Sequence, residues 1–201
     1  MKTPVLNIAP GKVINFHGEP CLVLEHREDG TLLLNTNQIE RAFGTSNDFA
    51  ASELMHHLNS AYLDSLTEGN PDEIITRTVD LTAVNGSKQY GSHNCKVAPL
   101  TLDEVRKYHD ILPKPEHFEW LATPWSTPKV DDDKTWVAGL APDGNIYYYY
   151  CSDSYGSRPA FLIPSNFAVE DDSAPADTED KPLEQYTTDE LIAELYRRTS
   201  R

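Results

Sequence analysis

Residue types that bind metals occur in three small groupings in this 201-residue sequence. The groupings are Cys21, Cys95 and Cys151, the neighbours His56 and His57, and the run Asp131, Asp132 and Asp133. Zinc sites need closely spaced ligands, helical histidine ligands need i, i+4 spacing, and calcium loops use alternate positions. Because no grouping has such a spacing, we predict no metal and no cofactor. We expect the cysteines to be reduced thiols in the core.

Catalytic residue types are present, but they form no recognisable motif. The sequence has no serine, histidine and aspartate order typical of a hydrolase, no glycine-rich phosphate loop and no obvious carboxylate pair. Because triads assemble in space and not in sequence, an uncharacterised enzyme stays as an alternative. We expect a protein that is not an enzyme and acts by binding.

The strongest candidates for binding are aromatic residues in the second half of the chain, because tryptophan and tyrosine dominate hot spots in protein interfaces. We expect a partner surface that includes Trp125, Trp136, Tyr148 and Tyr150. Alternate residues of a strand face opposite sides. At least one alternate pair of the four consecutive tyrosines at 147–150 should therefore belong to the core.

Arg158 is the remaining binding candidate, and it lies between a Gly-Ser turn and an apolar strand. Two interpretations are open. The guanidinium could contact a partner, or it could be buried and tie loop carbonyls or an acid such as Asp103 or Glu104 to the sheet. The second interpretation follows because a buried guanidinium must be paired.

The elements that carry these residues follow from apolar spacing and turn signals. Short apolar runs between glycine-containing turns predict an antiparallel hairpin unit over 10–36. Capping oxygens at 46–48 precede a predicted helix of about 15 residues whose apolar positions recur at helical spacing. A second, shorter helix over 101–108 should begin at Thr101, with acids in its first turn.

The second half of the domain reads as a hairpin and a closing strand. The Asp143-Gly144 turn should join strands over 136–140 and 145–150, because Asp-Gly between strand-forming runs is a strong hairpin signal. A strand over 158–163 follows, and Pro159 should place its start at a sheet edge or outside the ladder.

The composition changes near residue 169. Six acids, two prolines and no aromatic residue over 170–182 predict a disordered acidic linker, which we place at 169–182. An amphipathic helix over 183–201 should follow, because Thr187 and Glu190 form a capping-box pattern. Its apolar stripe, expected to contact a partner or a second copy, consists of Tyr186, Leu191, Ile192, Leu195 and Tyr196.

The formal net charge of −15 argues against direct nucleic-acid binding, because phosphate contacts require a basic face. Two interpretations of the charge are open: a device for solubility, or a nucleic-acid mimic that inhibits a host DNA- or RNA-binding protein. No run approaches the roughly 20 apolar residues that cross a bilayer, and no secretion signal is visible. We therefore expect a cytoplasmic protein of a bacterium or of a virus that infects one, without membrane contact.

Four blocks, taken in order, resemble a recurrent bacterial and phage domain of unknown function that is related to the sulfatase-modifying-factor and C-type-lectin-like fold. The helix motif at 52–62 resembles the family's serine, leucine, leucine-asparagine and closing aromatic, and 100–108 resembles its "leucine, serine or threonine, then glutamate" helix start. The run Trp-Leu-Ala-Thr-Pro at 120–124 resembles its Trp-Leu-Arg-Ser-Pro turn, and Gly-Ser-Arg-Pro-Ala at 156–160 resembles its Gly-Val-Arg-Pro-Ala ending.

The resemblance covers about residues 10–168 and departs from the family at Met55, His57 and Ala122, where an arginine, a tryptophan and an arginine are usual. It implies long loops over a twisted antiparallel sheet, on a scaffold without a shared catalytic set. The copper-binding cysteine pair of the enzyme branch has no supporting motif at Cys95 and Cys151, and the calcium patterns of true lectins are missing.

The sequence thus predicts one α+β, C-type-lectin-like domain over 1–168 with two helices, followed by the linker and the tethered C-terminal helix. The function we expect is that of a non-enzymatic protein-binding module, encoded by a phage or mobile element. Its loop face and C-terminal helix would contact a protein partner.

Overall fold

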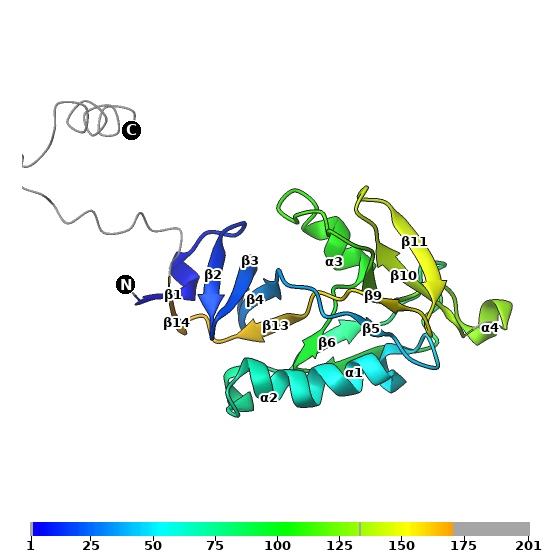
Figure 1. Ribbon diagram of the computed structural model, residues 1–201, viewed down its shortest axis with the longest axis horizontal. Coiled ribbons are helices and arrows are strands. Elements are labelled where there is room, and N and C mark those ends of the chain that lie inside the picture. Colours follow the sequence, from blue (N-terminus) through cyan, green and yellow to red (C-terminus); the bar gives the residue numbers. More distant parts are fainter. Residues whose placement is uncertain (1, 133, 171–201) are drawn as a thin grey trace, which may run out of the picture. The chain divides into compact units, whose positions relative to one another are not determined.

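The computed structural model of the protein describes residues 2–132 and 134–170, which are coloured in Figure 1. Most of the predicted acidic linker, the predicted C-terminal helix and the five residues of its stripe lie outside this part of the chain. Residues 169 and 170, which the sequence assigned to the linker, are the last residues of a strand. The sheet therefore continues two residues past the predicted domain end.

The largest sheet has seven strands, and every pairing between them is antiparallel. In spatial order the strands are β1 (Lys2–Pro4), β14 (Ala168–Glu170), β2 (Val13–Phe16), β3 (Glu19–Arg27), β4 (Gly30–Asn35), β13 (Ala160–Ile163) and β8 (Val97–Ala98). The strands predicted over 10–36 are present as β2, β3 and β4. His17 and Gly18 both have positive φ in the turn between β2 and β3, the conformation that tight hairpins require.

The predicted closing strand is β13, and it lies between β4 and β8 instead of at an edge. Pro159 precedes its first residue, so the alternative that placed this proline outside the ladder is confirmed. The edge alternative is wrong because the short strand β8, which has no clear sequence signal, pairs with the other side of β13 at Ala160 and Phe161.

The second sheet has three strands, in the order β11 (Ile146–Tyr150), β10 (Trp136–Leu140) and β9 (Glu119–Pro124). The predicted hairpin of β10 and β11 is confirmed, and the backbone amide of Asn145 donates to the Asp143 carboxylate within its turn. Two further pairs complete the strands: β12 (Ser154–Tyr155) with β5 (Arg41–Ala42), and β6 (Arg77–Asp80) with β7 (Ser92–Cys95).

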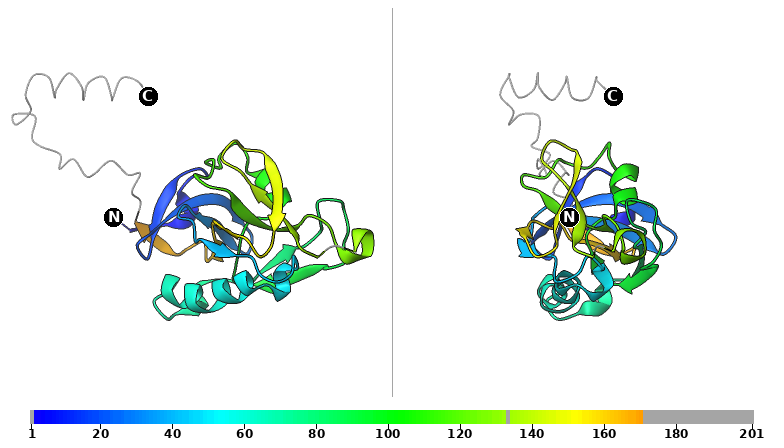
Figure 2. Two further views of the ribbon diagram at one scale, coloured as in Figure 1. Left: turned by 45° about the vertical axis from the view of Figure 1, so that its right-hand side comes forward. Right: turned by 90° about the vertical axis from the view of Figure 1, so that its right-hand side faces the viewer.

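The first helical segment runs over 53–66 as α1 (Glu53–His57), the π-helical turn η3 (Leu58–Tyr62) and α2 (Leu63–Leu66). It starts later than predicted, because Ser52 and not residues 46–48 caps it. Asp48 instead caps the short 3-10 turn η2 (Phe49–Ala51). Figures 1 and 2 show α1 and α2 lying along one side of the sheets.

The second predicted helix is α3 (Leu102–Lys107), capped by Thr101 as expected. The Thr101 hydroxyl accepts from the Glu104 amide, and the Glu104 carboxylate accepts from the Thr101 amide, which completes a capping box. The remaining short helices are η1 (Val5–Asn7), η4 (Pro71–Glu73) and α4 (Pro128–Asp131). In the described part of the chain, no helix has the length and apolar character needed to cross a membrane.

The core is divided by the central strands of the large sheet. On β4, Leu33 belongs to a cluster with Phe16, Trp120 and Phe161, while its neighbours on the strand belong to a second cluster under α3. Successive side chains face opposite sides of a strand. Because β4 is buried on both faces, its sequence contains an unbroken apolar run, Leu32 to Leu34. The protein is thus an α+β fold, built mainly from antiparallel sheets with few helices.

Candidate functional site

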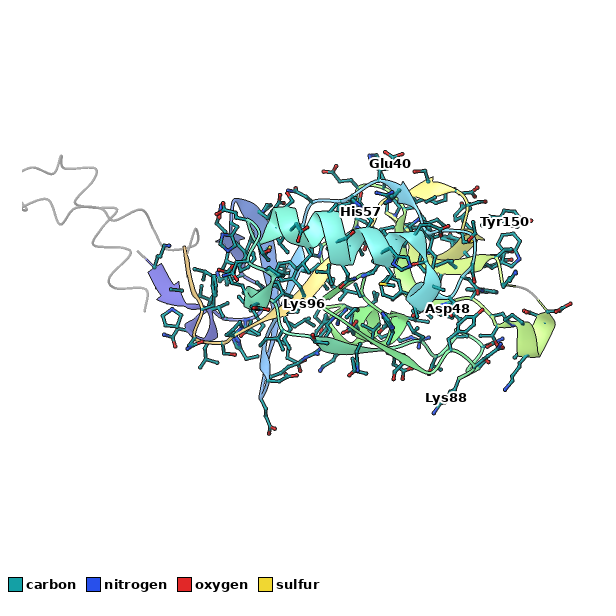
Figure 3. All side chains as sticks on the ribbon, turned by 90° about the horizontal axis from the view of Figure 1, so that it is seen from below. Glu40, Asp48, His57, Lys88, Lys96 and Tyr150 are labelled. Carbon is teal, nitrogen blue, oxygen red and sulfur yellow. The ribbon has the colours of Figure 1, made fainter. Side chains whose placement is uncertain are left out.

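The hairpin of β10 and β11 brings all four aromatic residues predicted for the partner surface onto one face. Trp136 stacks on Tyr150 with ring centroids 3.9 Å apart. Tyr148 lies 5.0 Å from Trp136 and 4.3 Å from Trp125. We call Trp125, Tyr148, Trp136 and Tyr150 the aromatic row. Figure 3 shows Tyr150 at the surface of the body.

Strand β11 exposes its tyrosines on both faces. The four residues Tyr147 to Tyr150 are 40–48% exposed, so the expectation that one alternate pair lies in the core is wrong. The reason is the position of the strand: β11 is the outer strand of its sheet, and the rest of the fold covers β10 instead. Val137 and Ala138 on β10 are accordingly fully buried.

At the free edge of β11, the backbone amide and carbonyl groups of alternate residues point away from β10. The Cys151 amide donates to the Thr135 carbonyl and the Ala141 amide to the Asn145 carbonyl, which fixes the hydrogen-bonded pairs of the ladder. In an antiparallel ladder these pairs alternate with pairs whose backbone groups point the other way. The amide and carbonyl of Tyr148 therefore point away from β10, toward the open edge.

An apolar pocket of 490 Å³ adjoins one end of the aromatic row. Trp125 and Ile146 line it from the second sheet, and Leu102, Val105, Arg106 and His109 line it from α3 and the turn that follows. A concave surface with apolar walls and a few polar groups is typical of a ligand or side-chain site. We call it the α3 pocket.

The α3 helix is held against the sheets by a network of charged side chains that sequence reasoning missed. Glu104 accepts from the buried guanidinium of Arg77 at 2.6 Å, and its carboxylate lies 3.6 Å from Arg27. Arg27 and Tyr108 both donate to Glu25. The only sequence signal was the acidic first turn predicted after Thr101, which placed Glu104 at the start of α3 but gave no indication of its partners.

Glu25 shows the strength of this network. Burial alone would raise the pKa of its carboxyl, but hydrogen bonds from Lys107, Tyr108 and Arg27 outweigh burial and lower the pKa from 4.5 to about 2. The network stabilises the ionised form. Because the network holds α3 in place, it also positions the wall of the α3 pocket that α3 forms.

Arg158 is not part of the exposed surface. Its side chain is 4% exposed, and its Nε and Nη2 donate to the two oxygens of Glu119 at 2.6 and 2.7 Å. Nη1 donates to the Pro113 carbonyl. The structural interpretation is therefore correct and the binding interpretation is wrong. The partner is Glu119 and neither Asp103 nor Glu104, because Arg106 pairs with the first and Arg77 with the second.

The three cysteines are not part of the exposed aromatic surface. Cys21, Cys95 and Cys151 are buried, and burial, the largest cause, raises the pKa of the Cys95 thiol to about 11. Thiols in this state are poor nucleophiles. Within residues 2–132 and 134–170, no group of three or more His, Cys, Asp or Glu side chains is arranged to hold a metal ion.

No protein-family model matches this chain, and neither a curated protein nor a solved structure matches it. Residue roles therefore come from the geometry above. The feature that stands out is the edge of β11, which no other strand of the described residues covers and which is flanked by aromatic rings and by an apolar pocket.

Proposed function

We propose that the protein is a non-enzymatic binding module that captures an extended segment of a partner protein along the edge of β11. The observation that carries this proposal is the open edge itself: within residues 2–132 and 134–170, β11 pairs with β10 on one side only, and its residues are Ile-Tyr-Tyr-Tyr-Tyr. Natural proteins usually protect such edges with lysine, proline or a bulge. An edge without these features is suited to the addition of a partner strand.

The side chains around β11 support the same proposal. A partner strand paired with β11 would place every second side chain over the aromatic row and the α3 pocket, because side chains alternate along a strand. Tyrosine and tryptophan provide large contact areas at low entropic cost. The net charge of −15 favours a partner segment that carries positive charge.

The experiment uses variants of Tyr148 with a matched control on the same strand. The Tyr148→Ala protein should bind the partner captured from the native host at least tenfold more weakly, because a central aromatic contact is lost. Tyr147→Ala removes an equally exposed ring from the opposite face of β11 and should reduce affinity less than threefold. Surface plasmon resonance with purified partner measures both.

A proline variant separates the backbone contact from the ring contact. Tyr148→Pro removes the outward amide but leaves the bonds of β11 to β10 intact, since proline is tolerated at sheet edges. If a partner strand pairs with β11, this variant should bind more weakly than Tyr148→Ala. Equal affinities of the alanine variants at 147 and 148, with no further loss from proline, would contradict the proposal.

The charge supports a second candidate, an acidic mimic that occupies the nucleic-acid site of a basic protein. The same binding assay discriminates between the two. Affinity should fall steeply with salt and the partner's nucleic acid should compete if carboxylates replace phosphates. Binding through β11 and its aromatic rings should be retained at high salt.

We further propose that the finer architecture is a C-type-lectin-like scaffold, as the sequence resemblance implies. Support comes from where three of its four blocks lie: on α1 with η3, on α3, and in the loop that leads into β13. The remaining block, at 120–124 and expected as a turn, is instead part of the strand β9. Superposition of an experimental structure on known domains of that fold would test the assignment.

A further inference from the structure

A second cluster of aromatic rings lies on the other face of β11. Phe118, Tyr149 and Tyr155 are in mutual contact, with all three centroid separations between 4.8 and 4.9 Å. Phe118 and Tyr155 line a pocket of 570 Å³ together with Gln38, Glu40, Glu116, His117, Pro142, Ser154 and Gly156. We call this the tyrosine pocket. It shares no lining residue with the α3 pocket.

We propose that the tyrosine pocket binds the cationic side chain of a lysine or arginine from a basic polypeptide. The faces of tyrosine and phenylalanine rings attract cations through their quadrupole, most strongly where several rings converge. The rings also pack against the apolar stem of such a side chain. A neutral apolar ligand would use only the second of these contacts.

The carboxylates at the rim give the pocket its charge. Glu40 and Glu116 line it and are exposed, and within residues 2–132 and 134–170 neither forms an ion pair. Figure 3 shows Glu40 at the surface of the body. Burial, the largest cause, and the charges of Tyr149 and Asp153 raise the pKa of Tyr155. Glu40 and Glu116 therefore give the rim a negative charge that favours a cationic ligand.

The nearest buried cation does not neutralise this charge, because it is already paired. Arg158 is held by Glu119 in a two-bond contact behind the pocket. The amide of Gln38 donates to Glu119 and to the His117 carbonyl, so Gln38 lies between the buried pair and the pocket. A side chain at Gly156 would meet Gln38 at 2.8 Å, and glycine there leaves room for this arrangement.

The direct test uses three pentapeptides, Gly-Ser-Xaa-Ser-Gly with blocked ends, in which Xaa is lysine, arginine or norleucine. Binding is followed by chemical shifts of the tyrosine rings in the full-length protein. The lysine or arginine peptide should bind about tenfold more tightly than the norleucine peptide, a difference of roughly 1.4 kcal/mol. Equal affinity for norleucine, or no binding of either cationic peptide at millimolar concentration, would overturn the proposal.

Paired variants at Tyr155, which lines the pocket, separate the ring's electrostatics from its bulk. Tyr155→Phe keeps the aromatic face and should change the affinity for the arginine peptide less than twofold. Tyr155→Leu keeps much of the apolar area without the quadrupole and should weaken binding of that peptide about fivefold or more. Thermal unfolding of both variants confirms that the fold is intact. Equal losses from Phe and Leu would overturn the proposed role of the rings.

The carboxylates have a charge-matched control. Glu40→Gln with Glu116→Gln removes two charges from the rim, and Glu28→Gln with Asp29→Asn removes two exposed charges from the turn between β3 and β4. The first pair of substitutions should lower the affinity for the arginine peptide at least fivefold, and the second pair should lower it less than twofold. Equal effects would show that the peptide is attracted by the net charge alone and would overturn the proposed site. None of these measurements involves Tyr148 or the natural partner, so they succeed or fail independently of the proposed function.

Discussion

The buried pair of Arg158 and Glu119 is the strongest single constraint at the level of residues. Both side chains are almost completely enclosed, and each satisfies the other through two hydrogen bonds. A charge in this position is tolerated only because its partner is present. Neither residue is free to contact a ligand, although both lie directly behind the tyrosine pocket.

We expect Arg158→Met to lower the free energy of unfolding by about 3–5 kcal/mol, because it leaves the Glu119 carboxylate buried without a partner. Urea denaturation measures this loss. The double variant Arg158→Met with Glu119→Leu should recover much of it, since no unpaired charge is left. A single variant as stable as the wild type would show that the pair does not act in this way.

The lowered pKa of Glu25 predicts how stability depends on acid. Because its pKa falls from 4.5 to about 2 on folding, Glu25 contributes stability that is fully present above pH 4.5 and is lost as the pH falls toward 2. We therefore expect Glu25→Gln to be less stable than the wild type at pH 7, with the two converging between pH 4.5 and 2. Unfolding at a series of pH values measures this, and a constant difference would contradict it. Glu28→Gln, an exposed neighbour, serves as the control.

The sequence predicted which residues share a face of a strand better than it predicted which residues form ion pairs. Trp125, Trp136, Tyr148 and Tyr150 do form one surface, because alternation along a strand and the hairpin turn determine which side chains share a face. The partner of Arg158 was wrong, because Glu119 is separated from it by 39 positions and is brought close by tertiary folding. Local spacing carries no information on such a contact.

At the level of elements, Asn59 explains how the first helical segment is held in place. Its side-chain amide donates to the carbonyls of Met55 and Val97, and its oxygen accepts from the amides of Lys96 and Val97. The residue lies in the π-helical turn η3 and joins it to β8. The sequence predicted the helix from its apolar spacing, but this polar clamp follows only from the position of β8.

Asn59→Ala should therefore destabilise the protein by roughly 1–3 kcal/mol, because backbone groups of β8 lose their partners. Ser60→Ala is the matched control, because the Ser60 hydroxyl donates to the His56 carbonyl, on the exposed side of its own helix. Thermal and urea unfolding compare the two. Equal stability of both variants would show that η3 is held by apolar packing alone.

Across the whole molecule, the antiparallel architecture was predictable because apolar runs and turn signals are local. The hairpins at 10–36 and 136–150 and the helix at 101–108 all follow from such signals. The order of strands in the large sheet was not predictable, because β1, β8 and β14 are short and pair with strands far away in the sequence. The exposure of β11 depends on its place as the outer strand of the second sheet, which the run of four tyrosines does not indicate.

The open edge of β11, described above for residues 2–132 and 134–170, also affects how copies of the protein interact with one another. Two copies can pair along this edge, so that β11 of each copy extends the sheet of the other. Pairing of open edges between molecules leads to aggregation. Mutual repulsion between molecules that each carry a charge of −15 opposes that encounter. The acidity that favours the proposed basic partner thus also opposes contact between copies of the chain.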